Sequence, residues 1–205
     1  MLVGEHEVYD LFLFGKFLKI TYNRIMDKVI KEIGQSIKSG EIGVIPTDTI
    51  YGIVCSALNK KLVAKIYKIK KRNLRKPVII LISKSKDLNL FGVKIDRVIA
   101  KKYWPGKVSI ILDCNNKKFE YLTRGQKSLA FRIPNNKFLT QVLEITGPII
   151  APSANLEGQK PAEDIEQAMK YFGKKVDFYV DVGKLKSKPS KIISIKDNKV
   201  KVIRK

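Results

Sequence analysis

The residues best suited to chemistry are hydroxyl-bearing and cationic side chains at the ends of short apolar runs. The run at 43–45 ends in Pro46-Thr47-Asp48-Thr49, and Tyr51-Gly52 follows. Further along, residues 68–77 read KIKKRNLRKP, in which six of ten residues are cationic. A pocket with hydroxyls on one wall and Lys and Arg on another suits a small polar anion beside a phosphate chain. The same residues could also form a plain turn and a solvated helix end, since cations favour helix C-termini.

Three further segments place a polar side chain where an apolar run ends. Arg132 lies in SLAFRIP, and its guanidinium could hold a carboxylate through two parallel hydrogen bonds. Ser153 and Asn155 lie in APSAN, a tight loop that can offer a hydroxyl, an amide and backbone N–H groups to an anion. Ser190 directly precedes the run KII. Each segment also has an ordinary interpretation, as an outward-facing strand residue or as a turn.

The composition excludes several kinds of site. His6 is the only histidine, so a Ser-His-Asp centre, a Cys-His centre or a histidine-based zinc site is not expected. Cys55 and Cys114 lie in or beside apolar runs without metal-like spacing, as buried free thiols of a reducing cytosol do. The sequence contains no GxxxxGK[ST] loop and no GxGxxG after a strand. Any ATP site must therefore be of another design.

The chain is strongly basic, with 41 Lys and Arg against 19 Asp and Glu and a formal net charge of +22. Of these cations 34 are Lys and 7 are Arg, alongside 27 Ile, which indicates a compositional bias. Even so, such a field attracts anions and favours weak, salt-dependent binding of tRNA. No apolar run approaches the roughly 20 residues of a spanning helix. Glu5, Glu7 and Asp10 stand where an export signal needs cations, so a cytoplasmic protein with no membrane association is expected.

Hydrophobic spacing predicts alternating helices and strands. Helices are expected at 26–38, 62–69, 97–103, 137–146 and 162–172. Strands are expected at 17–21, 43–45, 77–82, 107–112, 128–134 and 176–183, and as a hairpin at 191–195 and 199–203. In the segment 148–155 a strand is expected to break at Pro152 into a Ser-Ala-Asn loop. Residues 1–15 could add a strand or form a loose arm, and residues 119–127 are ambiguous. With 205 residues and no linker or repeat, the chain is expected to be one α/β domain (1–205), a twisted, mixed β-sheet flanked by helices.

Taken jointly, five motifs resemble the YrdC-like family of threonylcarbamoyl-AMP synthases in its short, single-domain form. In order they are PTDTIYG, KxR as Lys70-Lys71-Arg72 with Lys76-Pro77 close behind, WPG, AFRIP and PSAN. The resemblance runs from about residue 17 to the C-terminus, and five motifs in order are highly specific although each alone is weak. It implies a concave, positively charged cavity beside the twisted sheet.

The resemblance also implies an activity. The family is a group of nucleotidyltransferases that join L-threonine, bicarbonate or carbon dioxide, and ATP with Mg²⁺ into threonylcarbamoyl-adenylate and pyrophosphate. A partner protein then transfers the threonylcarbamoyl group to an adenosine of tRNA. Neither carbamate formation nor attack on the α-phosphorus requires a covalent enzyme intermediate. Orientation and cationic charge can supply the catalysis, which suits a chain without a usable histidine.

Carried over position by position, the resemblance implies roles for particular residues. Those expected to bind threonine are Thr47, Tyr51, Ser128, Arg132 and Ser153. Those expected to bind the nucleotide are Lys70, Arg72, Lys76, Ser153, Asn155, Ser190 and Arg204, with Lys70 and Arg72 as the catalytic cations. No carboxylate cage is apparent, so no metal ligands are assigned and Mg²⁺ is expected to bridge the phosphates.

Three departures from the family pattern concern details of threonine and triphosphate binding. The usual PSTI motif reads Pro189-Ser190-Lys191-Ile192, so a hydroxyl near the phosphates is lost at Lys191. The usual LRPG element is reduced to Ile203-Arg204-Lys205, and no second domain follows. Leu81 stands where some members carry histidine.

Two other functions compete with this one. The first is a non-catalytic RNA-binding module that uses the basic cavity, although no basic strand carries the interleaved aromatic residues that stack bases. The second is a carbamoyl-handling domain like those of hydrogenase maturation proteins. Those domains occur in longer chains with zinc-binding and acylphosphatase-like parts, which this sequence lacks.

Overall fold

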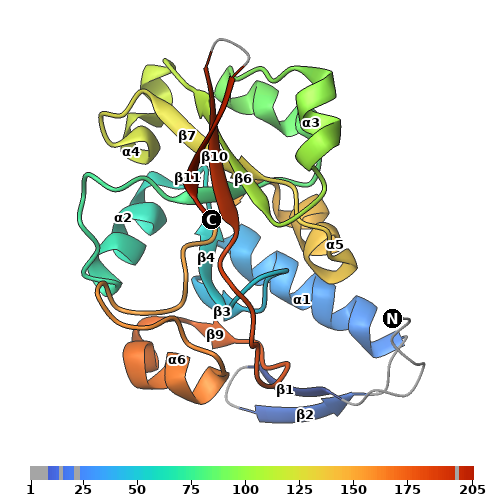
Figure 1. Cartoon of the computed structure of the whole chain (residues 1–205). Helices are drawn as coiled ribbons and strands as arrows, with labels where there is room; N and C mark the ends of the chain where they lie inside the picture. The colour runs from blue at the N-terminus through green and yellow to red at the C-terminus, as the bar shows by residue number, and fades with distance from the viewer. Residues whose placement is uncertain (1–8, 14–15, 21–23, 197–198) are drawn as a thin grey trace.

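The computed structural model describes residues 9–13, 16–20, 24–196 and 199–205 (Figure 1). Its main feature is a nine-stranded mixed sheet in the order β11-β10-β6-β7-β5-β8-β4-β3-β9. The pairs β10–β6, β5–β7 and β3–β9 are parallel, and the other five neighbouring pairs are antiparallel. A separate hairpin pairs β1 with β2. The α/β class and the mixed sheet expected from the sequence are confirmed.

The bounds of the elements are as follows. The strands are β1 (Tyr9–Leu13), β2 (Lys16–Ile20), β3 (Gly43–Ile45), β4 (Gly52–Ser56), β5 (Ile79–Leu81), β6 (Val108–Asp113), β7 (Ser128–Arg132), β8 (Ile149–Ile150), β9 (Phe178–Tyr179), β10 (Lys191–Lys196) and β11 (Lys199–Arg204). The α-helices are α1 (Arg24–Ser39), α2 (Lys60–Ile69), α3 (Arg97–Tyr103), α4 (Glu120–Thr123), α5 (Lys137–Thr146) and α6 (Ile165–Phe172). Short 3-10 turns cover Ser85–Phe91, Lys117–Phe119 and Gly173–Lys175.

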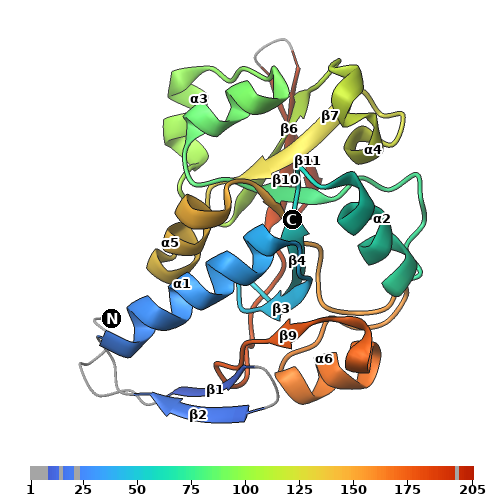
Figure 2. The same cartoon turned by 180° about the vertical axis from the view of Figure 1, so that it is seen from behind.

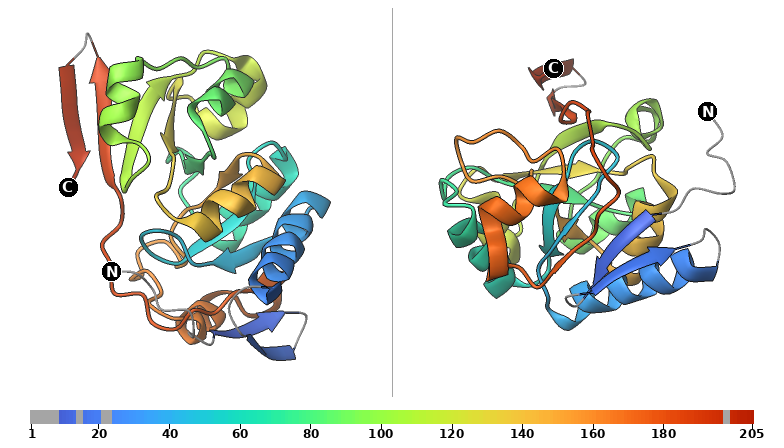
Figure 3. Two further views of the ribbon diagram at one scale, coloured as in Figure 1. Left: turned by 90° about the vertical axis from the view of Figure 1, so that its right-hand side faces the viewer. Right: turned by 90° about the horizontal axis from the view of Figure 1, so that it is seen from below.

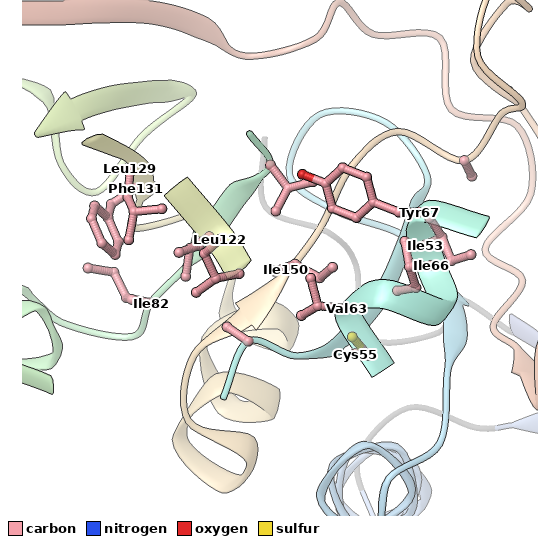
Figure 4. Close-up of a cluster of buried hydrophobic side chains, with 14 of the residues drawn as sticks. Ile53, Cys55, Val63, Ile66, Tyr67, Ile82, Leu122, Leu129, Phe131 and Ile150 are labelled. Carbon is pink, nitrogen blue, oxygen red and sulfur yellow. The ribbon is translucent and has the colours of Figure 1, made fainter. Parts of the chain in front are cut away.

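Helices cover the sheet on both faces and create two apolar layers. One layer contains apolar side chains of α1 and α5 with Ile45, Val54 and Leu81 of the sheet, and these two helices lie side by side in Figure 2. The other, larger layer contains side chains of α2, α6 and the segments around α3 and α4. Figure 4 shows part of it, where Tyr67 and Ile66 of α2 face the strands that carry Ile53 and Ile150.

Most expected helices begin where a side chain caps them. Asp96 accepts hydrogen bonds from Val98 N and Ile99 N before α3, and Asn136 accepts one from Leu139 N before α5. Asp164 caps α6 in the same way, accepting from Gln167 N. Residues 162–164 therefore remain outside that helix, and the expected start at residue 162 is wrong by three positions.

Two expected strands are much shorter in the structure. In the segment 148–155, the expected break at Pro152 is confirmed, since Pro152 has no N–H to donate and the chain turns away there, but the strand before it is only β8. The segment 176–183 contributes only β9. At the start of β3, the Phe178 ring lies where a Cβ of Gly43 would be, 2.2 Å from its ideal position, so this parallel pairing requires glycine.

The strands predicted near both termini are present in the structure. The strand expected at 17–21 is β2, and within 1–15 the described residues 9–13 form β1, so the extra-strand interpretation holds there. The expected C-terminal hairpin is β10–β11, an antiparallel pair at the edge of the sheet (Figure 3). Residues 1–8, 14–15, 21–23 and 197–198 lie outside the described residues, and so does the last position of the strand expected at 17–21.

Candidate active site

Two cavities lie next to each other beside β5, β7 and the final hairpin. The first chamber has a volume of about 240 Å³ and the second about 630 Å³. Both are lined by Arg72, the chain from Pro77 to Ile79, Ile192 and Arg204. Because they share these residues, the two chambers form one cleft with Arg72 and Arg204 at the junction.

The loop after β3 forms one wall of the first chamber and is held by its own hydroxyls. Thr47 Oγ1 accepts hydrogen bonds from Thr49 N at 3.1 Å and Ile50 N at 3.2 Å. It donates to Ile50 O at 2.7 Å and lies 3.0 Å from Thr49 Oγ1. Thr47 is therefore fully used within the loop, whereas the hydroxyl of Thr49 has capacity for a ligand.

Arg132 lies at the end of β7 and lines the first chamber, although it is 3% exposed. Its Nη2 lies 2.9 Å from Oδ1 of Asp48, and both side chains are buried. Burial raises the pKa of the Asp48 carboxyl, and the Arg132 guanidinium opposes that rise. Burial lowers the pKa of Arg132, and Asp48 opposes that fall. The pair therefore places the Arg132 guanidinium at the chamber wall, and Asp48 neutralises its charge.

The loop after β8 forms the opposite wall, and Lys70 holds it. Lys70 Nζ donates to the carbonyl oxygens of Ser153 and Asn155. Ser153 Oγ donates to Asn155 Oδ1 at 2.6 Å, and Asn155 Nδ2 donates to Leu156 O and Gln159 O. Burial, helped by nearby Arg72, lowers the pKa of Lys70 to about 7. Lys70 is 2% exposed and lines neither chamber, so it contacts the cleft through this loop.

The segment after α2 turns sharply and places Arg72 in the cleft. Lys71 has φ 51°, a left-handed conformation that ends the helix. Arg72 Nη2 donates to Pro77 O at 2.8 Å. Lys76 Nζ contacts Glu157 Oε1, and Glu157 Oε2 accepts from Asn73 N, so this segment is tied to the loop after β8.

The final hairpin closes the junction between the chambers. Ser190 Oγ lies 2.9 Å from Ser109 Oγ on β6. Arg204 donates from Nε and Nη2 to Ser190 O, at 3.0 and 2.7 Å. Ser190 is buried, and both residues line the first chamber.

The second chamber differs in character from the first. Its walls are largely apolar, and Arg75, Lys76, Gln126 and Ser128 add polar side chains to the shared Arg72 and Arg204. The apolar lining residues include Val78, Ile79, Ile111, Leu129 and Ile203.

The structure brings together most, but not all, of the residues expected from the sequence. Seven of them line the first chamber: Thr47, Tyr51, Arg72, Arg132, Ser153, Ser190 and Arg204. Lys76 and Ser128 line the second chamber, so Ser128 does not share a chamber with Arg132 at the other end of β7. Lys70 and Asn155 lie behind the Ser153 loop. Their predicted ligand contacts stay predictions.

Tyr51 has a structural role that the sequence did not indicate. Its hydroxyl donates to Gly183 O at 2.7 Å and accepts from Val182 N at 3.0 Å. Burial raises the pKa of this phenol above its usual value. Tyr51 therefore fixes the connection between β9 and β10, and its ring forms part of the chamber wall.

Sequence reasoning missed three residues of the site. Thr49 lines the first chamber, Asp48 neutralises Arg132, and Glu157 joins the two loops. Asp48 and Thr49 are part of the PTDT motif. An acidic residue between two threonines, in a chain with a lone Arg in an apolar strand, could have indicated this ion pair.

The described residues contain no group of three His, Cys, Asp or Glu side chains that could hold a metal ion. The carboxylate of Asp48, which stands between the chamber-lining residues Thr47 and Thr49, is engaged with Arg132.

Comparison with known proteins identifies the family. The Sua5/YciO/YrdC family model, whose description is telomere recombination, matches residues 35–205. The chain belongs to this family. A Methanocaldococcus jannaschii relative, provisionally named threonylcarbamoyl-AMP synthase, is 33% identical over 86% of this chain and 85% of its own length. The threonylcarbamoyl-AMP synthase of Marinobacter nauticus is 30% identical over 78% of this chain and 88% of its own length.

A solved family structure has the same fold. It is Sua5 of Pyrococcus abyssi complexed with L-threonine, with a TM-score of 0.81 and 26% sequence identity. The match covers 89% of this chain and 55% of the Sua5 chain, so this chain spans about half of that family member. Among the described residues of this chain, no helix combines the length and the apolar character needed to cross a membrane.

Proposed function

We propose that this protein is a threonylcarbamoyl-AMP synthase, a nucleotidyltransferase that makes threonylcarbamoyl-adenylate and pyrophosphate. Its substrates are L-threonine, bicarbonate or carbon dioxide, and ATP. The observation that carries the proposal is the division of the cleft. A small chamber with hydroxyls and a buried Arg adjoins a larger, mostly apolar chamber, and two Arg side chains mark the junction.

The first chamber suits the amino acid. Arg132 would hold the threonine carboxylate, because a guanidinium can donate two parallel hydrogen bonds to it. The Thr49 hydroxyl would face the threonine side chain, since Thr47 is already engaged in its loop. Ser153 Oγ donates to Asn155 and still has acceptor capacity for a donor on the substrate.

The junction and the second chamber suit the nucleotide. Arg72 and Arg204 would contact phosphate oxygens at the point where the chambers meet. The apolar wall formed by Ile79, Leu129 and Ile203 would accept the adenine ring, and Lys76 and Ser128 would lie toward the ribose or phosphates. Lys70 would act through the Ser153–Asn155 loop that it holds. Mg²⁺ would enter with ATP and neutralise phosphate charge.

The reaction can proceed in two balanced steps. The neutral threonine amine attacks carbon dioxide, forming a C–N bond, and releases one proton as the carbamate forms. A carbamate oxygen then attacks the α-phosphorus, a P–O bond to the β-phosphate breaks, and pyrophosphate leaves with its electron pair. When bicarbonate is the source, one water is released in place of that proton. The cleft residues would orient the carbamate and stabilise the charge that develops on pyrophosphate.

The test is pyrophosphate release by the purified protein. We expect release to require L-threonine, bicarbonate and ATP with magnesium together. Valine should react at least tenfold more slowly, because a site that hydrogen-bonds a hydroxyl penalises its absence. Mass spectrometry should detect threonylcarbamoyl-adenylate. Pyrophosphate release that is independent of threonine would reject the assignment, and equal turnover with valine would reject the assignment of the first chamber.

We also propose that the adenylate is passed to a transferase partner that modifies tRNA, and that tRNA binds this basic chain weakly. The charge of +22 supports electrostatic binding that weakens steeply with salt and has little sequence preference. Filter binding between 50 and about 300 mM salt tests this. Tight binding at the highest salt and without ATP would favour an RNA-binding module instead.

A further inference from the structure

The Asp48–Arg132 pair is unusual because it is buried and yet its hydrogen bonds are poorly aligned. Arg132 Nη2 lies 2.9 Å from Asp48 Oδ1, and the side chains are 4% and 3% exposed. Neither Asp48 oxygen nor Arg132 Nε meets strict hydrogen-bond geometry with a described residue, although backbone N–H groups of Asp48 and Asn135 lie close enough to lower the pKa of the carboxyl. Buried polar groups are normally hydrogen-bonded, so this arrangement requires an explanation.

Asp48 lies behind Arg132 as seen from the first chamber. Arg132 lines that chamber, whereas Asp48 does not. Since Arg132 Nε is buried, the guanidinium can meet a ligand only through its terminal amino groups. Asp48 contacts one of them, Nη2, which has a second N–H. A carboxylate in the chamber could therefore take that N–H together with one from Nη1.

The position of Asp48 is fixed by its loop. Thr47 Oγ1 on one side of it accepts from Thr49 N and Ile50 N and donates to Ile50 O, closing the turn around Asp48. Arg132 is at the end of β7, and β5, β8 and β4 separate β7 from β3 in the sheet. The ion pair thus joins two distant strand ends across the floor of the first chamber.

We propose that Asp48 is a positioning residue, which holds the Arg132 guanidinium from behind in the orientation that grips the carboxylate of the amino acid. This inference rests on the proposed function for the identity of the ligand. The negative charge of Asp48 repels an incoming carboxylate and acts against binding. Asp48 therefore strengthens binding only by orienting Arg132 and by offsetting the cost of burying the guanidinium charge.

Because charge repulsion and orientation of Arg132 act in opposite directions, the change in threonine affinity on removing Asp48 shows which effect dominates. If Asp48 acted only by neutralising charge, Asp48→Ala would tighten threonine binding. If it positions Arg132, Asp48→Ala should raise the Kd and KM for threonine by about tenfold to a hundredfold. The KM for ATP should change less than about twofold. Asp48→Asn retains one acceptor at the same place and should recover part of the loss.

Two further measurements separate positioning from a general loss of stability. In an Arg132→Lys background, Asp48→Ala should add little to the threonine defect, because positioning acts through the guanidinium. Asp96→Ala is a matched control, since it removes a buttressing Asp from the start of α3, away from the cleft. It should lower the unfolding midpoint while leaving both KM values unchanged.

The state of Arg132 can also be read without activity. The chain contains only 7 Arg, so the Nε–H signal of Arg132 can be assigned in ¹⁵N NMR spectra by its absence from Arg132→Lys. In the wild type this N–H should exchange slowly with solvent, and Asp48→Ala should broaden or remove the signal.

The outcomes distinguish this proposal from the proposed function. Absence of threonine-dependent pyrophosphate in the wild type rejects the function, and the NMR comparison still decides whether Asp48 orders Arg132. Unchanged or tighter threonine binding in Asp48→Ala, an equal effect on ATP, or an unaltered Arg132 signal each overturns the positioning role.

Discussion

The two chambers of the cleft differ in how their polar groups are held. In the first chamber, Thr49 and Arg132 are each 3% exposed and are fixed by buried contacts. In the second, the Lys76 side chain is 60% exposed and pairs with Glu157 at the surface. A prearranged buried group can discriminate between ligands, whereas exposed cations provide attraction that water and salt weaken. The comparison therefore predicts that specificity resides in the first chamber and general anion affinity in the second.

The largest effect is expected from Arg132→Ala, which tests whether specificity for the amino acid resides in the first chamber. It should raise the KM for threonine by about 10²–10³-fold, since truncating one member of a buried charge pair costs 2–5 kcal/mol. ATP affinity should remain nearly intact. Arg132→Lys should rescue only partly, because lysine keeps the charge but lacks the fork. Separate titrations of the two substrates check this, and a variant that lost ATP but kept threonine would reverse the assigned orientation of the cleft.

Arg72→Ala tests the junction between the chambers. Arg72 is half-buried and would face the leaving pyrophosphate, so its loss should lower kcat by about 10²-fold, the scale for one charge-stabilising donor. The KM for threonine should change little. Steady-state assays with each substrate varied in turn provide the measurement. A threonine defect as large as that of Arg132→Ala would mean that the two ends of the cleft are not distinct.

Lys70, which holds one wall of the first chamber, should make the stability of the protein depend on pH. Burial lowers its pKa from 10.5 to about 7, with Arg72 adding to the fall and Glu157 opposing it. Between these values the unfolded chain keeps a proton that the folded protein releases, so the free energy of unfolding should rise with pH. Below about pH 7 both states are protonated and this contribution is constant.

Denaturant unfolding of wild type and Lys70→Met at pH 6.5 and 8.5 tests that effect. We expect the wild type to gain about 2 kcal/mol relative to the variant at the higher pH, from about 1.4 kcal/mol per pH unit. Lys65→Met, an exposed change on the same helix, is the control. A difference that stays constant or shrinks as pH rises would show that Lys70 remains charged in the folded protein.

The smallest effect is expected from the surface of the second chamber. Lys76→Gln removes an exposed ion pair with Glu157, and such pairs contribute about 0–1 kcal/mol. The KM for ATP should rise no more than about fivefold at low salt, and the difference should vanish near 0.5 M salt. A salt-independent defect larger than that of Arg72→Ala would contradict the division between the chambers.

The sequence predicted which segments form the walls of this cleft better than it predicted which chamber each side chain reaches. The motifs around Thr47, Arg132 and Ser153 lie at ends of apolar runs, and periodicity locates such ends. The sequence could not show that Ser128 and Arg132, four residues apart on β7, reach different chambers, because the boundary combines Arg72 and residues 77–79 with the distant final hairpin. It also could not show that Lys70 points to backbone carbonyls rather than to the cleft, since that depends on burial.

The place of the final hairpin has a consequence for protein synthesis. Ser190 and Arg204 complete a cavity whose first wall begins at Thr47, and β10 pairs with β6, far earlier in the chain. A ribosome adds about 5–20 residues per second, so the nascent chain carries Thr47 and Arg132 for on the order of ten seconds before Arg204 emerges. During that interval substrate has no finished site to bind, and it cannot help the earlier strands to fold. Any order that the β1–β8 segments reach during that interval comes from their own packing and not from a ligand.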